Sequence, residues 1–229
     1  STLLAQAASL DAPRAALFAP WVQVPDGNGG ARVISPESYV AAARSRAHEI
    51  TGPWRPGAGE VSKARWVTAA DQIFGYRGAN DLDAGKVNVI QTVSAAVRVY
   101  GWRSLSDDPA NWRFLSAADT INSVVTEARA KLEPYVLAPI DDKGHLLASI
   151  AGTLEGIVKP MADMGGLFGW TDEDGTERDP GYKVTVDGSL NTRASLGDNQ
   201  VFAQLALRPA PTAALVYLTV TKASVTAQL

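Results

Sequence analysis

The histidines and their acidic neighbours are the first place to look for chemistry, because the chain has two histidines and no cysteine. Asp141, Asp142 and His145 lie close together, and imidazole with carboxylates is a ligand set that transition metals accept. The same residues suit a solvated helix start, where side-chain oxygens accept free backbone N–H groups. We favour the helix start and expect no metal or other cofactor. His48 has no Gly-x-Ser-x-Gly nucleophile to serve, so no catalytic residue is expected.

Two short stretches have the composition of ligand-binding loops. Residues 25–30 read PDGNGG, but a phosphate-binding loop runs from its glycines into Lys-Ser or Lys-Thr at a helix start, and neither follows. Residues 170–181 read WTDEDGTERDPG, and an EF-hand loop with Gly175 at its sixth position would need an acid where Trp170 stands. We therefore predict a hairpin turn in the first stretch and a solvated acidic tip in the second.

Charge and hydropathy exclude some classes of protein. The chain of 229 residues carries a formal charge of −3, whereas proteins that bind nucleic acid directly usually present a basic face. No apolar run approaches the roughly 20 residues of a membrane-spanning helix, so no membrane insertion is expected. The N-terminus has neither an initiator Met nor the basic start of a signal peptide, and we expect a lead-in from a longer chain.

Hydrophobic periodicity predicts an α+β fold: one mixed β-sheet, two long helices packed on a face of it, and an extended terminal arm strand. The strands are expected within residues 16–34, 87–102, 182–186 and 201–221, and the long helices at 116–132 and 146–164.

Helix-start signals support this assignment. Ser35, followed by proline, predicts a third helix that runs to about residue 46. Ser116 and Asp119 have the spacing of a partial capping box. Residues 71–83, rich in Gly, Asn and Asp, are predicted to be loop.

The stretch from residue 86 to 112 has the strongest strand pattern and also the most specific motif. Residues 85–90 (GKVNVI) and 97–106 (VRVYGWRSLS) resemble the tail sheath proteins of contractile bacteriophages and related injection machines. That family has a G-x-N-x-I strand, a break, and then R-V-W/Y-G-A-R-T-L-S; Trp102 replaces the small residue before the arginine.

Two further blocks match the same family in the same order. Residues 25–60 resemble its V-P-D turn, the helix that follows and an R-G-x-x-K-A-P-A-G loop, with Arg55 where a lysine is common. Residues 198–221 resemble its closing strands. The matched blocks together extend over about residues 18–221, while the acidic stretch lies outside the common pattern.

The resemblance implies the C-terminal region of a structural subunit that polymerises helically around a tail tube and contracts to drive the tube through a host envelope. The implied partners are further copies, linked through terminal arms, and the tail tube protein. The implied place is the tail sheath of a virion, assembled in the host cytoplasm. The expected domains are a lead-in at residues 1–16, a core at 17–211 and an arm strand at 212–229. An enzyme with a dispersed carboxylate site and a carbohydrate-binding tail fibre module are the alternatives.

Two sets of residues are expected to make the contacts of such a subunit. The inter-subunit strand follows Pro209 and Pro211, which lack the N–H that a sheet needs. Its contact residues are Ala213, Leu215, Val216, Tyr217, Leu218 and Val220. Lys143 and Lys159, before and on the second long helix, are the candidates for facing the tube. An edge strand within the same chain, and lysines that are merely solvated, are the alternatives.

Overall fold

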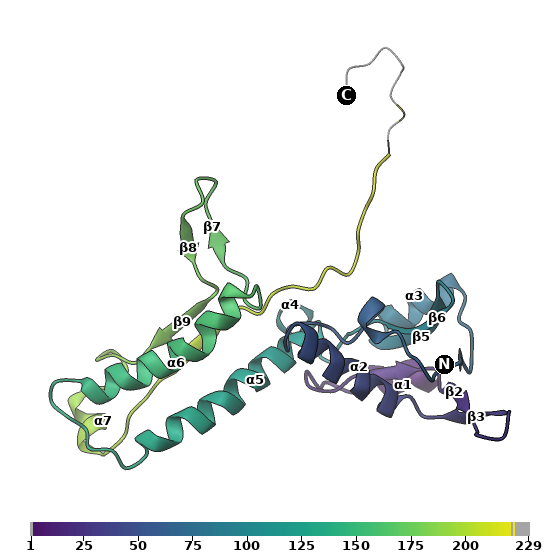
Figure 1. Ribbon diagram of the computed structural model, residues 1–229. Helices are drawn as coiled ribbons and strands as arrows, with labels where there is room; N and C mark the ends of the chain where they lie inside the picture. Colours follow the sequence, from purple (N-terminus) through teal and green to yellow (C-terminus); the bar gives the residue numbers. More distant parts are fainter. Residues whose placement is uncertain (1, 221, 223–229) are drawn as a thin grey trace.

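The computed structural model describes residues 2–220 and 222 and shows two groups of elements joined through the long helix α5 (Leu115–Leu132) (Figure 1). The N-terminal group precedes α5 and consists of α1 (Thr2–Ala8), β1 (Leu17–Ala19), β2 (Val22–Pro25), β3 (Ala31–Ile34), α2 (Glu37–Ile50), the 3₁₀ turn η1 (Gly59–Ser62), β4 (Ala69–Ala70), α3 (Tyr76–Ala84), β5 (Val87–Val93), β6 (Ala96–Tyr100) and α4 (Pro109–Trp112).

The C-terminal group follows α5. It consists of the 3₁₀ turn η2 (Glu133–Tyr135), α6 (His145–Asp163), β7 (Trp170–Thr171), β8 (Glu177–Asp179), β9 (Tyr182–Thr185), α7 (Arg193–Gly197) and β10 (Gln204–Leu207). In Figure 1, α5 and α6 lie side by side, β9 lies beside α6, and the β7–β8 hairpin stands out from this group. No described helix is both long enough and apolar enough to cross a membrane.

Strand β5 is the centre of the first sheet, which is mixed because β1 pairs with it in parallel and β6 antiparallel. The two strands predicted here are confirmed: residues 87–90 of β5 are all buried, and in β6 the buried Val97 and Val99 alternate with the more exposed Arg98 and Tyr100. Ile90 faces one hydrophobic cluster with Val97 and Val99, while Val87 and Val89 face another. The sheet therefore separates two cores, because neighbouring side chains of a strand point to opposite faces.

Strand β2 is the centre of the second sheet, with β3 and β4 on either side. The turn predicted at residues 25–30 joins β2 to β3. The Asp26 carboxylate closes it by accepting hydrogen bonds from the backbone N–H groups of Asn28 at 2.8 Å and Gly30 at 2.9 Å. This stretch is a hairpin turn, as predicted from the absence of the Lys-Ser or Lys-Thr that follows the glycines of a phosphate-binding loop.

Helix α3 occupies residues 76–84, where the sequence predicted loop, so that prediction was wrong. Leu82 is buried and Ala79 packs with it in the same cluster as Val87. Helix α1, in the expected lead-in, places Ala7 in this cluster too. Tertiary packing of a few apolar side chains stabilises a helix more than its composition suggests, and a local reading of Gly, Asn and Asp cannot detect it.

The two long helices are confirmed to within one residue at each end. The capping box is wrong: α5 begins before Ser116, so Ser116 and Asp119 both lie inside the helix, where they are buried. Helix α2 begins after Pro36 without a side-chain cap from Ser35 and continues to Ile50. Its longer course reflects the burial of Ala47 on the last turns.

The α+β class is confirmed, but the strands form four small sheets in the described part of the chain instead of one. β9 and β10 pair only with each other, as do β7 and β8. α5 and α6 pack mainly on one another, and α6 covers β9. Periodicity identifies strands, but it does not say which of them pair, because pairing depends on contacts far apart in sequence.

Asn88 is the polar residue that ties the first sheet together. It is fully buried on β5, and its Nδ2 donates to the carbonyl oxygens of Leu17 at 3.0 Å and Arg103 at 2.9 Å. Its Oδ1 accepts from the backbone N–H of Arg103 at 2.6 Å. One buried amide thus bonds three backbone groups, one on β1 and two on Arg103 after β6.

Replacing this amide should destabilise the whole N-terminal group. We expect Asn88→Ala to lower the free energy of unfolding by about 3 kcal/mol, because buried backbone groups lose their partner. Asn111→Ala is the matched control, since Asn111 bonds the exposed Asp108 carboxylate at 2.7 Å, and it should cost about 0.5 kcal/mol or less. Urea denaturation followed by circular dichroism measures both; equal losses would contradict the role of Asn88.

Candidate assembly surfaces

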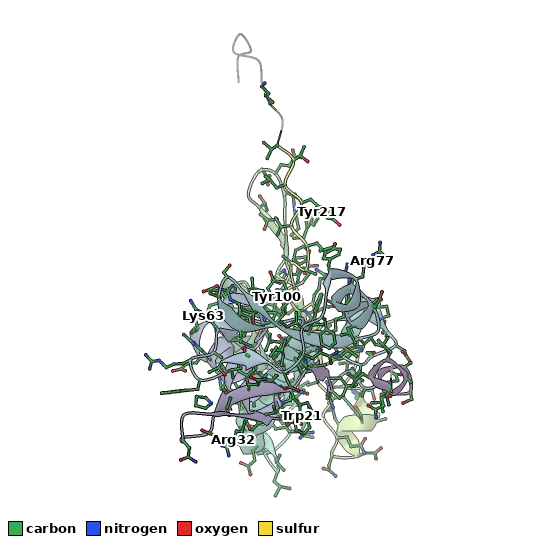
Figure 2. All side chains as sticks on the ribbon, turned by 90° about the vertical axis from the view of Figure 1, so that its right-hand side faces the viewer. Trp21, Arg32, Lys63, Arg77, Tyr100 and Tyr217 are labelled. Carbon is green, nitrogen blue, oxygen red and sulfur yellow. The ribbon has the colours of Figure 1, made fainter. Side chains whose placement is uncertain are left out.

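The C-terminal arm, defined here as residues 213–220, is the most exposed apolar segment of the described chain. Beyond β10, Ala210 N–H donates to the Gly166 carbonyl at 3.0 Å, and the hydroxyls of Thr212 and Ser116 lie 3.3 Å apart. Past Thr212 the chain leaves the body (Figure 1), and Figure 2 shows Tyr217 standing clear of it. Residues 213–220 therefore do not form an edge strand within the same chain, which was the alternative.

The arm has neither a backbone partner nor a covering surface among the described residues. The large side chains at its predicted contact positions are 72–89% exposed: Leu215, Val216, Tyr217, Leu218 and Val220. Ala213 is exposed as well, no hydrogen bond links residues 213–220 to the described chain, and Thr221 lies outside the described residues. The arm combines free N–H and C=O groups with apolar side chains, which is what a strand has before it joins a sheet.

The two tube-facing candidates are exposed but are not brought together. Lys143 lies in the turn before α6 and Lys159 near its end, so roughly 21 Å of helix, at 1.5 Å per residue from His145, lies between them. Gly152 and Gly156 lie between them on the helix, and open space surrounds both positions where a side chain would start. The outward face of α6 thus has two glycines, the exposed Glu155 between them, and a lysine near each end.

The candidate metal residues form a helix cap. Asp141 accepts backbone N–H groups from Lys143 and His145, both at 3.0 Å, and from Leu146 at 2.9 Å. These hydrogen bonds, first that from His145, hold the pKa of the Asp141 carboxyl below its usual value. No group of three or more potential metal ligands occurs within residues 2–220 and 222. The helix-start interpretation of this segment is confirmed.

A charged cluster around the buried Asp119 carboxylate, between α2 and α5, went unpredicted. The Asp119 carboxylate is 1% exposed and forms a two-pronged ion pair with Arg44, one arm of which is the 3.1 Å contact from Nε. His48 Nε2 lies 3.5 Å from the same carboxylate. Beside them is a hollow of about 570 Å³, whose other lining residues are Pro53, Asn122, Ser123, Thr126, Glu127 and Ala130.

The electrostatics of this cluster favour a structural role. Burial lowers the pKa of the His48 imidazole, although Asp119 opposes the shift, so the ring is neutral at pH 7. Burial also raises the pKa of Asp119, and Arg44 opposes that shift. Within the described chain no hydroxyl forms a hydrogen bond with His48, so the cluster lacks the base–nucleophile pair of a hydrolytic site. In the sequence, the one signal for this charged cluster is a carboxylate, Asp119, inside a predicted helix.

The comparisons with known proteins identify the fold. No protein-family model matches the chain, and no curated protein does. Among solved structures, the sheath complex of an extracellular contractile injection system, PVC, in its contracted state matches with a TM-score of 0.81 at 18% identity; the match covers 97% of this chain and 60% of that one.

A second match is the baseplate of the anti-feeding prophage (AFP), with a TM-score of 0.78 at 18% identity, covering 93% of this chain and 56% of that one. The AFP helical sheath in its contracted state gives the same TM-score and identity, with 93% and 57% covered. The chain thus spans about 60% or less of the length of these structures. Its fold is that of contractile injection system sheath and baseplate chains, which confirms the resemblance at the level of the fold.

The buried ion pair should matter more than its exposed counterpart on the same helix. We expect Asp119→Ala to lower the free energy of unfolding by about 2 kcal/mol, less than for a fully buried pair because Arg44 can be rehydrated. Glu127→Ala, which removes the exposed pair with Lys131 on the same helix, should cost about 0.5 kcal/mol or less. Thermal and urea unfolding of the full chain measure the difference; similar losses would show that Asp119 does not hold α2 to α5.

Proposed function

We propose that this chain is a structural subunit of a contractile tail sheath, and that its C-terminal arm adds a strand to a sheet of another copy. The observation that carries the proposal is the arm: residues 213–220 expose apolar side chains and unpaired backbone, and they leave the body just after a segment that contains two prolines. The shared fold supports the same assignment, because the matching chains come from sheath and baseplate assemblies.

The energetics explain why the arm needs a partner. Ordering an extended segment costs about 1–2 kcal/mol per residue, and each ladder hydrogen bond returns only about 1 kcal/mol. Burying Leu, Val and Tyr side chains contributes about 1.5–3 kcal/mol each, so these side chains decide whether the strand forms. Added strands combine main-chain affinity with side-chain register, which suits a repeating assembly of identical copies.

The subunit requires no cofactor for this role. Copies polymerise helically around the tube, and contraction changes how neighbouring bodies pack while the arms keep them linked. The energy of contraction lies in the difference between two arrangements of the same subunits. The tube lies against α6, where Gly152 and Gly156 allow close approach and Lys159 supplies a modest attraction that salt weakens. The subunit belongs to the tail of a phage or of an extracellular injection machine.

Removing the arm tests the assembly role. A full-length protein that lacks the segment from Pro211 to Leu229 should fold, stay soluble and fail to form tubes in negative-stain electron microscopy. Its melting temperature should remain near that of the intact protein, because residues 213–220 form no hydrogen bond with the described body and the deletion removes one side-chain contact, that of Thr212 with Ser116. Unfolding of the truncated protein, or normal tubes, would overturn the assignment.

Proline scanning tests whether the arm acts as a strand. Adjacent residues of a strand point their N–H groups to opposite edges, so Tyr217→Pro and Leu218→Pro should differ sharply if the arm joins one edge. One should abolish tubes and the other should leave them; both should fail if the arm lies between two strands. Tyr217→Thr and Leu218→Thr keep the N–H groups and serve as controls. Normal assembly by both proline variants would contradict strand addition.

Charge reversal tests the tube-facing surface. Lys159→Glu in the full-length protein should leave tubeless sheath polymers intact and reduce sleeves formed on tubes, with a stronger deficit at low salt. Lys183→Glu is the control, because Lys183 is an exposed lysine on β9 rather than α6. The measurement is a count of sleeves in electron micrographs. Unchanged tube binding by Lys159→Glu would contradict a contact between the tube and this face of α6.

A further inference from the structure

The β7–β8 hairpin presents the acidic tip that the sequence resemblance leaves unassigned. Its residues 171–179 (TDEDGTERD) hold five acidic residues and one basic residue. The turn is well formed: Asp172 N–H donates to the Thr176 carbonyl at 2.9 Å, and Gly175 adopts φ +81°. The Asp174 carboxylate accepts the Thr176 N–H at 2.9 Å, a hydrogen bond that holds its pKa below the usual value. Arg178 Nε lies 2.5 Å from the Asp172 carboxylate, and the stretch still has four more acidic residues than basic ones.

The base of the hairpin is clamped, so the tip is held away from the body. Arg208 Nη1 donates to the Phe168 carbonyl at 3.1 Å and to the Asp179 carboxylate at 2.8 Å. These two bonds link both sides of the hairpin base to the residue that follows β10. Gly181 at φ +81° lies so close to Phe168 that a side chain there would meet its backbone at 2.8 Å. Figure 1 shows the hairpin standing apart from the group that holds α2.

A basic hollow of about 400 Å³ lies on the N-terminal group. It is formed by the end of α2, the following loop and η1, and it is lined by Arg46, Ile50, Thr51, Arg55, Glu60, Val61 and Lys63. Arg46, Arg55 and Lys63 form no ion pair within residues 2–220 and 222. Figure 2 shows Lys63 at the outer edge of the molecule.

The single acidic residue of the hollow is already neutralised. Glu60 pairs with Arg98 at 2.7 Å, and the Arg98 side chain is 13% exposed. The Nε of Arg98 is buried and lacks a hydrogen-bond partner within the described chain. The hollow therefore has three cations without an ion-pair partner in the described chain, next to the Arg98–Glu60 pair. Such a surface attracts carboxylates or other anionic groups.

We infer that the acidic hairpin tip of one copy docks in the basic hollow of a neighbouring copy. The charges are complementary, and both surfaces belong to this chain. An exposed apolar side chain accompanies each: Ile50 lines the hollow and Trp170 lies at the start of the hairpin. Within one chain, no hydrogen bond or ion pair joins the described tip to the hollow. This contact rests on the proposed assembly, to which it adds an electrostatic link separate from the arm.

Cysteine cross-linking tests the contact directly, because the chain contains no cysteine of its own. Glu173→Cys and a size-tagged Lys63→Cys, mixed under conditions that give polymers and then oxidised, should form a disulfide-linked pair of one copy each. Ala148→Cys, an exposed position on α6, replaces Lys63→Cys in the control mixture and should give little of that product. Equal yields in the two mixtures would overturn the inference.

Charge exchange supplies the second test. Glu173→Lys with Asp174→Lys should raise the critical concentration for assembly about tenfold, and so should Arg46→Glu with Lys63→Glu, since each places like charges together. Mixing or combining the two double variants should restore assembly. Wild-type polymers with no response to either reversal would overturn the docking and leave the sheath proposal standing, whereas a wild-type chain that never assembles would overturn both.

Discussion

The ion pair between Asp119 and Arg44 fixes α2 on α5, the helix that joins the two groups of elements. Asp119 lies on the second turn of α5, whose first residues, Leu115 and Ala118, pack into the N-terminal core. Val124, further along the same helix, packs into the C-terminal core. A carboxylate with 1% exposure needs its cation, because an unpaired buried charge is strongly destabilising. The pair therefore fixes α2 on the one helix that both cores share.

Several surface features take their positions from this junction. Trp54, in the loop after α2, reaches into the C-terminal core and packs so closely on Gly166 that a side chain there would meet the ring at 2.4 Å. Ser116, one turn before Asp119, contacts Thr212 where the arm begins. The start of the arm and the helix that ends at the basic hollow are thus held against the same two turns of α5. A shift of α2 on α5 would move both surfaces together.

Local patterns predicted the parts of the fold that depend on local physics. The β5–β6 hairpin follows from the alternation of Val87, Val89, Val97 and Val99, and the long helices follow from their apolar stripes. Asp119 was misjudged because its partner Arg44 lies 75 residues away, and no local rule distinguishes a capping carboxylate from a buried one. The arm segment was predicted from its composition, its prolines and the resemblance to sheath proteins, but its lack of a partner within the described chain required the three-dimensional structure.

The prolines after β10 explain why the arm is free. β10 pairs with β9 and ends at Leu207, after which Arg208 N–H still donates to the Gly181 carbonyl at 2.8 Å. Pro209 and Pro211 have no N–H to continue that ladder. The chain instead pairs briefly with residues 166–168, through the Arg208 carbonyl and the Ala210 N–H, before it leaves the body, although its later residues have high strand propensity. An apolar segment that cannot extend its own sheet remains available to another one.

A strand that joins a neighbour by backbone hydrogen bonds tolerates rotation of the bodies at either end, because the link depends on the sheet edge and not on a rigid body-to-body interface. This is the property that a sheath needs if its subunits are to repack without separating.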